Sequence, residues 1–182
     1  MGRTYSKEKL FHDIDAGNKQ NTRYILSQYP ELVNEYLDSY QTSLPIMRPI
    51  WVNNTTMFDL LVSLKADINK RTSNGYTALF LAAEKGRYEI LTKLLNMPNC
   101  QYNLTDKNGL SPLDVAIVNG YYNCAQKLIY KGLEPKTVEF YQAHKKSFVD
   151  YEIDFNWFLI NLEQGNKLSD RRANKQLFVK KM

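Results

Sequence analysis

Side chains that commonly perform acid–base or nucleophilic catalysis are few in this chain and lie far apart. The 182 residues include two histidines, His12 and His144, and two cysteines, Cys100 and Cys124. No Ser/His/Asp order, glycine-rich phosphate loop or zinc-protease motif accompanies them. The cysteines form no Cys-x-x-Cys pair, and neither histidine stands at metal-ligand spacing from them. The sequence therefore predicts a protein that is not an enzyme and that uses no cofactor and no metal.

The cysteines also indicate a compartment. Cys124 stands 34 residues after Ile90, at an inward-facing position of an expected helix, which predicts a small apolar core residue. Cys100 falls in an expected turn and has no assigned role. Two cysteines without a pairing motif are typical of a reducing environment, so we expect a cytoplasmic location.

Two stretches of the chain, residues 74–95 and 108–129, repeat each other at an offset of 34. The matching landmarks are Gly75 and Gly109, Thr77 and Ser111, Leu79 and Leu113, Gly86 and Gly120, and Leu94 and Leu128. A period of this length is typical of stacked units, because one unit cannot bury its apolar face without a neighbour. The elements that must position any functional side chain are therefore repeated helical units.

At these residues the chain resembles the ankyrin repeat family. Residues 77–82 and 111–116 are variants of the Thr-Pro-Leu-His-x-Ala signature, and residues 66–69 resemble the Ala-Asp-Val-Asn turn between units. The resemblance implies an all-α solenoid of about four to five helix-turn-helix units with degenerate terminal caps. Asp114 stands where the signature usually has histidine, and we expect it to hydrogen-bond the turn rather than to catalyse a reaction.

The register extends the repeat in both directions and predicts one ankyrin repeat domain over residues 1–166. The expected units are 8–40, 41–73, 74–107, 108–135 and a degenerate unit at 136–166. In the first unit, Leu10 to Gly17 should form an inner helix, Tyr24 to Leu26 part of an outer helix, and residues 30–34 the exit turn. Terminal units are expected to be atypical because one face meets water.

The unit at 41–73 is the irregular one. Pro49 falls inside its expected inner helix, so that helix is either short, beginning near Pro49, or kinked. Asn53 takes the place of Gly86 and Gly120, which is reasonable because asparagine tolerates a positive φ. Lys65 stands where a glycine is usual, and the stretch 36–43 is longer than a standard finger loop.

The excess positive charge of the chain lies in a basic tail, residues 167–182. This tail has six basic side chains and one acidic one, which equals the net charge of +5 of the whole chain. One interpretation is a solvated helix, capped by Ser169 or Asp170, with residues 177–179 docked on the last repeat. The alternative interpretations are that the tail binds an acidic protein surface, an anionic lipid or a nucleic acid.

Two further segments leave alternatives open. Residues 149–157 alternate apolar and polar side chains, typical of a strand, but Asp154 followed by Trp157 to Ile160 favours a loop that enters a helix. At the N-terminus we expect a frayed polar leader, without a secretory signal peptide; Gly2 and Ser6 weakly fit an N-myristoylation pattern. No window is apolar enough for a membrane span.

The resemblance also implies a binding surface, since family members present variable side chains on a concave face of inner helices and finger turns. Five of the positions carried over are apolar, although folding should not require it, and we expect them to anchor a partner protein. The candidate site residues are Tyr40, Trp51, Ser73, Tyr76, Glu84, Lys85, Lys107, Leu110, Val118 and Asn119.

Three functions remain open from the sequence. The first is a monomeric protein-binding module that acts as an adaptor or targeting device, and the second is an inhibitor or immunity partner that occludes an enzyme. The third uses the basic tail to reach nucleic acid or membrane. Seventeen asparagines and thirteen tyrosines suggest an AT-rich coding sequence. Small ankyrin proteins of this composition resemble bacterial effectors that act in a host cytoplasm, which we favour, and also ankyrin proteins of protists and large viruses. The identity of the partner does not follow from the fold.

Overall fold

The computed structural model describes residues 2–136 and residue 140, and for residues 2–6 the backbone only. Within residues 2–136 the chain forms eight α-helices, one 3-10 helix and no strand. The first four elements are α1 (Gly2–Asp15), α2 (Lys19–Gln28), η1 (Pro30–Asn34) and α3 (Met47–Trp51). The others are α4 (Thr55–Ser63), α5 (Ala78–Glu84), α6 (Tyr88–Leu95), α7 (Pro112–Val118) and α8 (Tyr122–Tyr130).

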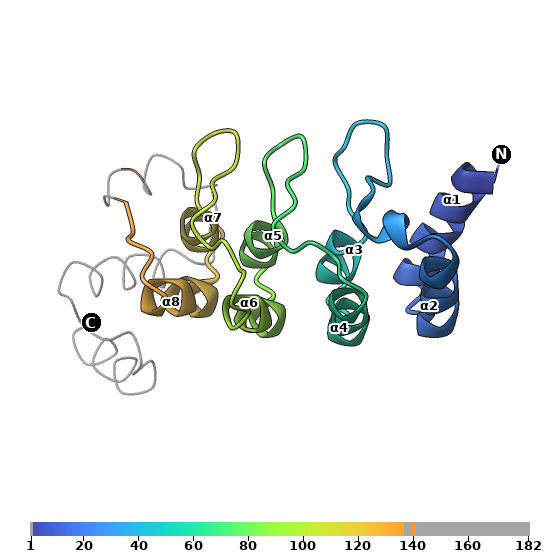
Figure 1. The fold of residues 1–182 in the computed structure, drawn as a ribbon. Helices are drawn as coiled ribbons and strands as arrows, with labels where there is room; N and C mark the ends of the chain where they lie inside the picture. The colour runs from blue at the N-terminus through green and yellow to red at the C-terminus, as the bar shows by residue number, and fades with distance from the viewer. Residues whose placement is uncertain (1, 137–139, 141–182) are drawn as a thin grey trace, which may run out of the picture.

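The helices form two parallel rows (Figure 1). The inner row contains α1, α3, α5 and α7, and the outer row contains α2, α4, α6 and α8. Each helix of the inner row packs against the next one in that row, and α6 packs between α4 and α8. Long loops project from the inner row on the side away from the outer row. The predicted all-α repeat solenoid is confirmed by this arrangement of four helix pairs.

The landmarks of the 34-residue period form the core that joins the pairs. Leu79 and Leu113, together with Leu94 and Leu128, are at most 1% exposed and belong to a single apolar cluster. Each fully buried leucine contributes about 1.5–3 kcal/mol relative to an exposed one. Because each pair supplies only part of this cluster, the repeats stabilise one another.

Polar caps set the starts of the regular inner helices. The Thr77 hydroxyl accepts a hydrogen bond from the Phe80 backbone N–H at the start of α5. At the start of α7, the Ser111 hydroxyl accepts a hydrogen bond from the Asp114 backbone N–H. The Ser111 backbone N–H in turn donates to the Asp114 carboxylate at 2.8 Å. This reciprocal arrangement satisfies two helix-start donors that would otherwise lack partners. The structural role expected for Asp114 is therefore confirmed.

The irregular pair, α3 and α4, accommodates a proline within its inner helix and non-glycine residues at positive φ. The helix α3 has only five residues, and Pro49 is its third, so the missing N–H lies in the first turn where no intrahelical partner is needed. The short-helix alternative is correct, although the helix begins at Met47. Asn53 has a positive φ of 57°, as its alignment with Gly86 and Gly120 predicted, and Lys65, which replaces a usual glycine, has a positive φ of 70°.

The N-terminal helix pair also matches its expected elements, with one exception. Residues 10–17 contain the end of α1 and its glycine, residues 24–26 lie in α2, and η1 occupies the expected exit turn. The expectation of a frayed leader is wrong, because α1 begins at Gly2. The segment 149–157, His144, the basic tail and most of the degenerate unit at 136–166 lie outside the described residues.

Candidate protein-binding surface

The ten predicted site residues fall into two groups at opposite ends of the inner helices. The finger surface contains residues of the loops 35–46, 64–77 and 96–111, namely Tyr40, Ser73, Tyr76, Lys107 and Leu110. The helix-end surface lies where the inner helices end and contains Trp51, Glu84, Lys85, Val118 and Asn119. A seven-residue helix such as α5 is about 10 Å long, so the two groups are separated by roughly that distance.

The finger surface has exposed tips and a partly buried base. The Tyr40 side chain is 80% exposed, and Ser73 and Lys107 are exposed as well. Tyr76 instead stacks on Phe80 with ring centroids 4.5 Å apart, and Leu110 packs against the same core. Burial raises the pKa of Tyr76, and the carboxylates of Glu84 and Asp106 raise it further.

Three apolar site positions therefore contribute to folding. Tyr76, Leu110 and Val118 are all partly buried against the apolar core. The expectation that folding places no apolar requirement on these positions is wrong, because the stacked neighbours partly cover them. Tyr40 and Trp51 remain as the large exposed aromatic side chains among the predicted residues.

Backbone hydrogen bonds join the fingers to one another. The Ser73 N–H donates to Gln41 O at 2.8 Å, and the Lys107 N–H donates to Asn74 O at 3.0 Å. Within the third finger, the Asp106 carboxylate accepts from the backbone N–H groups of Asn108 and Leu110. Hydrogen bonds thus connect neighbouring finger loops, and the exposed side chains project from a backbone that these bonds hold in place.

At the helix-end surface, Trp51 is held by a cation. Its ring is 47% exposed, and the Lys85 Nζ lies 3.9 Å from the ring centroid. Lys85 also pairs with the neighbouring Glu84 carboxylate at 3.3 Å. A cation–π contact of this kind contributes about 0.5–1 kcal/mol at an exposed site and restricts the orientation of the ring.

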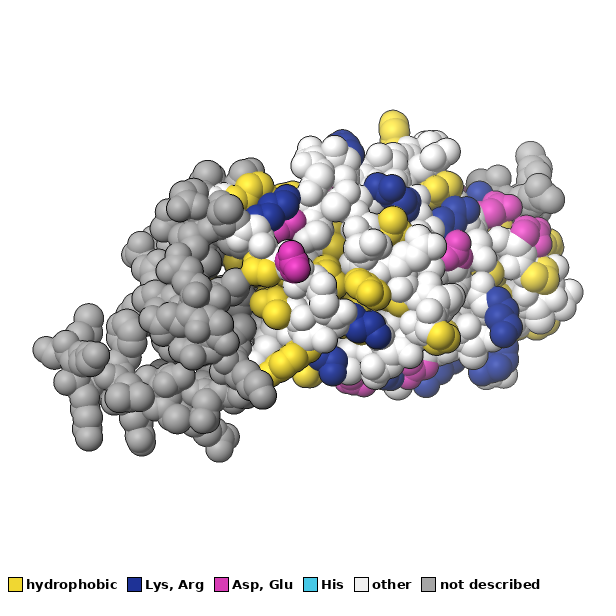
Figure 2. All heavy atoms as spheres, turned by 60° about the vertical axis from the view of Figure 1, so that its left-hand side comes forward, with side chains coloured by type: hydrophobic (Ala, Val, Ile, Leu, Met, Phe, Trp, Pro, Cys, Tyr) yellow, Lys and Arg dark blue, Asp and Glu magenta, His cyan; other side chains and the backbone are white. Residues whose placement is uncertain are grey.

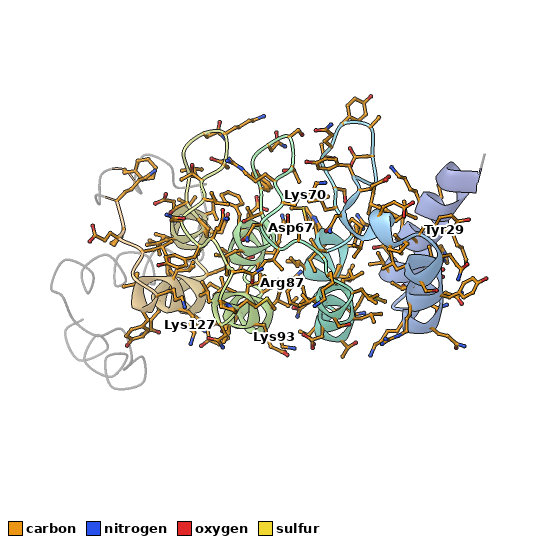
Figure 3. The ribbon with its side chains drawn as sticks, viewed as in Figure 1. Tyr29, Asp67, Lys70, Arg87, Lys93 and Lys127 are labelled. Atoms are coloured by element: carbon orange, nitrogen blue, oxygen red, sulfur yellow. The ribbon has the colours of Figure 1, made fainter. Side chains whose placement is uncertain are left out.

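Two functional candidates at this surface were missed by sequence reasoning. Arg87 reaches back to α3, where Nε donates to Ile50 O at 3.1 Å and Nη2 donates to Trp51 O at 2.7 Å. Figure 3 labels Arg87 between the α5–α6 pair and the α3–α4 pair. The Tyr121 ring lies against Gly86 and is 40% exposed. Asn119, which was predicted, lies next to them and contacts Glu84 O at 3.5 Å through Nδ2.

The two cysteines and His12 show no arrangement typical of catalysis. Cys124 is 1% exposed, as predicted, and burial raises its thiol pKa to about 12. Burial also raises the pKa of Cys100, against a smaller lowering by Lys131. The exposed His12 lies 3.7 Å from the buried Asp13 carboxylate. Among the described residues, no three His, Cys, Asp or Glu side chains gather as a metal site would require.

The visible face in Figure 2 is chemically mixed. Hydrophobic side chains gather in the left half of the described surface, next to the larger grey region, and charged side chains of both signs are spread between and beyond them. Such a face offers apolar anchors within a polar surround, the composition of many non-obligate interfaces. In the described part of the chain, no helix is both long and apolar enough to span a bilayer.

Comparison with known families agrees with this architecture. Residues 46–139 match the family described as "Ankyrin repeats (3 copies)". The chain belongs to the ankyrin repeat family. This fold is an interaction fold that is typically non-catalytic, and the ankyrin repeats imply a protein–protein interaction module.

Three proteins that are similar to part of this chain come from a spider, a rodent and a plant. Alpha-latrocrustotoxin-Lt1a of Latrodectus tredecimguttatus is 29% identical over 111 residues, 61% of this chain and 8% of the toxin. Ankyrin repeat and SAM domain-containing protein 6 of Rattus norvegicus is 33% identical over 110 residues, 60% of this chain and 12% of that protein. Probable E3 ubiquitin-protein ligase XBOS32 of Oryza sativa subsp. japonica is 27% identical over 148 residues, 81% of this chain and 29% of that protein.

This ankyrin repeat chain thus spans less than a third of the length of each of these relatives. Their similarity supports the repeats and does not carry over what the whole proteins do. The unit boundaries, the candidate site residues and a bacterial origin stay predictions.

Proposed function

We propose that this ankyrin repeat protein binds a partner protein through the finger and helix-end surfaces and catalyses no reaction itself. The observation that carries the proposal is Trp51, a large aromatic side chain left half exposed and fixed by Lys85 on a rigid helical stack. Tyr40 adds a second exposed aromatic side chain at a finger tip.

The physical argument concerns entropy as well as area. Tryptophan and tyrosine bring a large contact area with only two rotatable side-chain bonds, so little conformational freedom is lost on binding. Such residues dominate the binding energy of many interfaces. Because α3 and α5 hold Trp51 and Lys85 through the packed core, the surface needs little reorganisation when a partner arrives.

The test is affinity capture from a eukaryotic cytosol, followed by identification of the co-eluting protein and measurement of its affinity. We expect Trp51→Ala to weaken binding about tenfold or more, the loss typical of a central aromatic anchor. The matched control is Tyr24→Ala, because Tyr24 is 66% exposed but lies on α2 in the outer row. An affinity lowered equally by both variants, or by neither, contradicts the proposal.

The adaptor and inhibitor roles can be separated once a partner is known. An inhibitor lowers the catalytic activity of the captured partner in proportion to occupancy, and an adaptor leaves that activity unchanged. Binding that survives Trp51→Ala and vanishes on deletion of residues 167–182 would favour the basic tail, with nucleic acid or membrane as its target. A monomeric state, a cytoplasmic location and an effector role in a host cell are part of the same proposal.

A further inference from the structure

The turn that joins α5 to α6 lies between two exposed aromatic rings from neighbouring helix pairs. On one side is Trp51, with Lys85 Nζ 3.9 Å from its ring centroid. On the other side is Tyr121, so close to Gly86 that a Cβ added to this glycine would lie 2.4 Å from a ring carbon. The two rings and the turn between them form one continuous surface. Val52, which follows Trp51, extends it with a side chain that is 52% exposed.

This surface has more cationic than anionic groups. Arg87 uses Nε and Nη2 on backbone carbonyl oxygens, and its Nη1 has no partner within residues 2–136. Because carbonyl oxygens carry no net charge, the guanidinium charge is not neutralised by these bonds. Lys85 pairs with Glu84, but a partly exposed ion pair of this kind contributes only about 0–1 kcal/mol. This part of the surface therefore has two cations, Lys85 and Arg87, and one carboxylate, Glu84, which pairs with Lys85.

A second carboxylate, at the end of another inner-row helix, is already engaged. Asp15, at the end of α1, accepts from Arg48 Nε at 2.8 Å and also from Arg48 Nη2. This two-bond pair is the strong arrangement for arginine and carboxylate. Asp15 is therefore engaged by Arg48, and within residues 2–136 the Nη1 of Arg87 stays available to an incoming carboxylate.

We propose that the helix-end surface binds an extended segment of a partner protein in which an acidic residue neighbours an apolar one. The carboxylate would meet Lys85 and Arg87 Nη1, and the apolar side chain would pack on Trp51 and Val52. This inference rests on the proposed protein-binding function and names the chemistry of its partner. Charge complementarity of this kind selects partners and raises association rates more than it adds affinity.

A nucleic acid fits this surface less well than an acidic peptide. Residues 1–166 carry 18 basic and 18 acidic side chains, whereas a nucleic-acid surface needs a broad positive excess. One face of the Trp51 ring is already covered by Lys85, which leaves less of it for base stacking. Glu84, in the middle of the surface, would repel neighbouring phosphates and could be displaced locally by a single carboxylate.

The experiment uses a phage-displayed library of random dodecapeptides, selected on the full chain. We expect enriched peptides to carry Asp or Glu within two residues of an aliphatic or aromatic residue. An enriched peptide, made with a fluorescent label, should bind about tenfold more weakly to Lys85→Glu and more weakly at high salt. Selection on Lys85→Glu should enrich Lys and Arg instead of Asp and Glu.

The matched control is Lys127→Glu, which makes the same charge change on α8 in the outer row, away from Arg87 (Figure 3). It should leave the affinity of the enriched peptide unchanged. If Lys85→Glu fails to fold by circular dichroism, Lys85→Gln removes the charge without repelling Glu84 and should weaken the peptide severalfold. The inference would be overturned if the enriched peptides had no acidic bias, or if the peptide bound Lys85→Glu and Lys85→Gln as tightly as the wild type.

The result also separates this inference from the proposed function. If a captured protein depends on Trp51 but the selected peptides show no acidic bias, the proposed protein-binding function stands and the inference of an acidic partner segment is rejected. Loss of both Trp51 dependence and peptide selection rejects protein binding itself. Tighter binding of single-stranded oligothymidylate than of any peptide, sensitive to Lys85→Glu, would reject the acidic segment in favour of a nucleic acid.

Discussion

The irregular pair α3–α4 and the regular pairs α5–α8 reach the same architecture by different local means. In the regular pairs, hydroxyl caps begin the inner helices and Gly86 and Gly120 supply the positive φ of the tight turns. In the irregular pair, the N-cap residue of α3 is Ile46, which offers no side-chain hydrogen bond, and Asn53 and Lys65 hold the positive φ values. The irregular pair is thus less well adapted to its backbone.

The exposed aromatic side chains of the candidate site are concentrated in the same irregular region. Tyr40 and Trp51 come from its finger and its short helix, whereas Tyr76 and Leu110, from the regular fingers, pack against the core. Natural proteins keep locally unfavourable choices where function requires them. The comparison therefore assigns stability mainly to α5–α8 and places the exposed aromatic anchors, Tyr40 and Trp51, in residues 35–65.

The largest expected effect is in the regular region, at Gly86. A Cβ at this position would lie 2.4–2.7 Å from three carbons of the Tyr121 ring, in addition to the positive φ of 65°. We expect Gly86→Ala to lower the free energy of unfolding by about 3 kcal/mol, the sum of backbone strain and overpacking. Urea denaturation measures this loss.

Gly109→Ala is the matched control for this prediction. Gly109 has a φ of 76°, but nothing lies within 4 Å of a Cβ added there. Only the backbone penalty of about 1–2 kcal/mol should remain. Equal losses at the two glycines would show that Tyr121 does not pack against this turn, and the aromatic surface inferred around it would be incorrect.

The capping box of α7 should give the next effect. Ser111→Ala removes the acceptor for the Asp114 N–H and one partner of the Asp114 carboxylate, which is 1% exposed. We expect a loss of about 1–2 kcal/mol, because a helix cap and a bond to a buried charge disappear together. The control Thr56→Ala, near the start of α4, should cost less, since the Asn54 cap remains in place. A larger loss at Thr56 would reverse the ranking of regular and irregular pairs.

Periodic features were predictable from sequence because they depend on neighbours within one unit. The buried leucines follow from aligning residues 74–95 with 108–129. The positive φ of Asn53 follows from its register with Gly86 and Gly120, and the cap at Asp114 from the family signature. Contacts between units were not predictable in the same way. Arg87 binds carbonyl groups 36 and 37 residues earlier, and nothing in its local sequence indicates where its guanidinium goes.

The burial of Tyr76 escaped prediction for a different reason. Its position varies in the family, which suggested an exposed contact residue, but Phe80 on the following helix provides a stacking surface. A variable position can therefore be partly structural when its own unit contains an aromatic partner. The predicted contact residues that remain exposed aromatic candidates, Tyr40 and Trp51, belong to the irregular unit, where the sequence departs from the repeat pattern.

Lys65→Gly should remove backbone strain from the irregular pair and raise the stability of the protein. Lys65 has a φ of 70°, which a non-glycine residue adopts at a cost, and its carbonyl oxygen keeps its bond from Asn34 whatever the side chain. We expect the free energy of unfolding to rise by about 1 kcal/mol. The same change at Lys131, which ends α8 with a φ of −80°, should lower stability. If both changes destabilise the protein, Lys65 is not strained.

The smallest expected effect concerns Asp38, which organises the long finger below Tyr40. Slight burial works to raise the pKa of this carboxyl, but hydrogen bonds from Thr42, together with backbone donors of Ser43 and Tyr40, outweigh it and lower the pKa from 3.8. A carboxyl whose folded-state pKa is depressed adds stability above the unfolded-state value and loses it as the pH falls through the folded value. The stability difference between the wild type and Asp38→Ala, well under about 1 kcal/mol near neutral pH for so exposed a group, should therefore shrink as the pH falls below 3.8. Denaturation curves at pH 7 and pH 2.5 measure it. A difference that grows in acid would mean that the finger is stabilised by the protonated form, and the fixed geometry inferred for Tyr40 would lose its support.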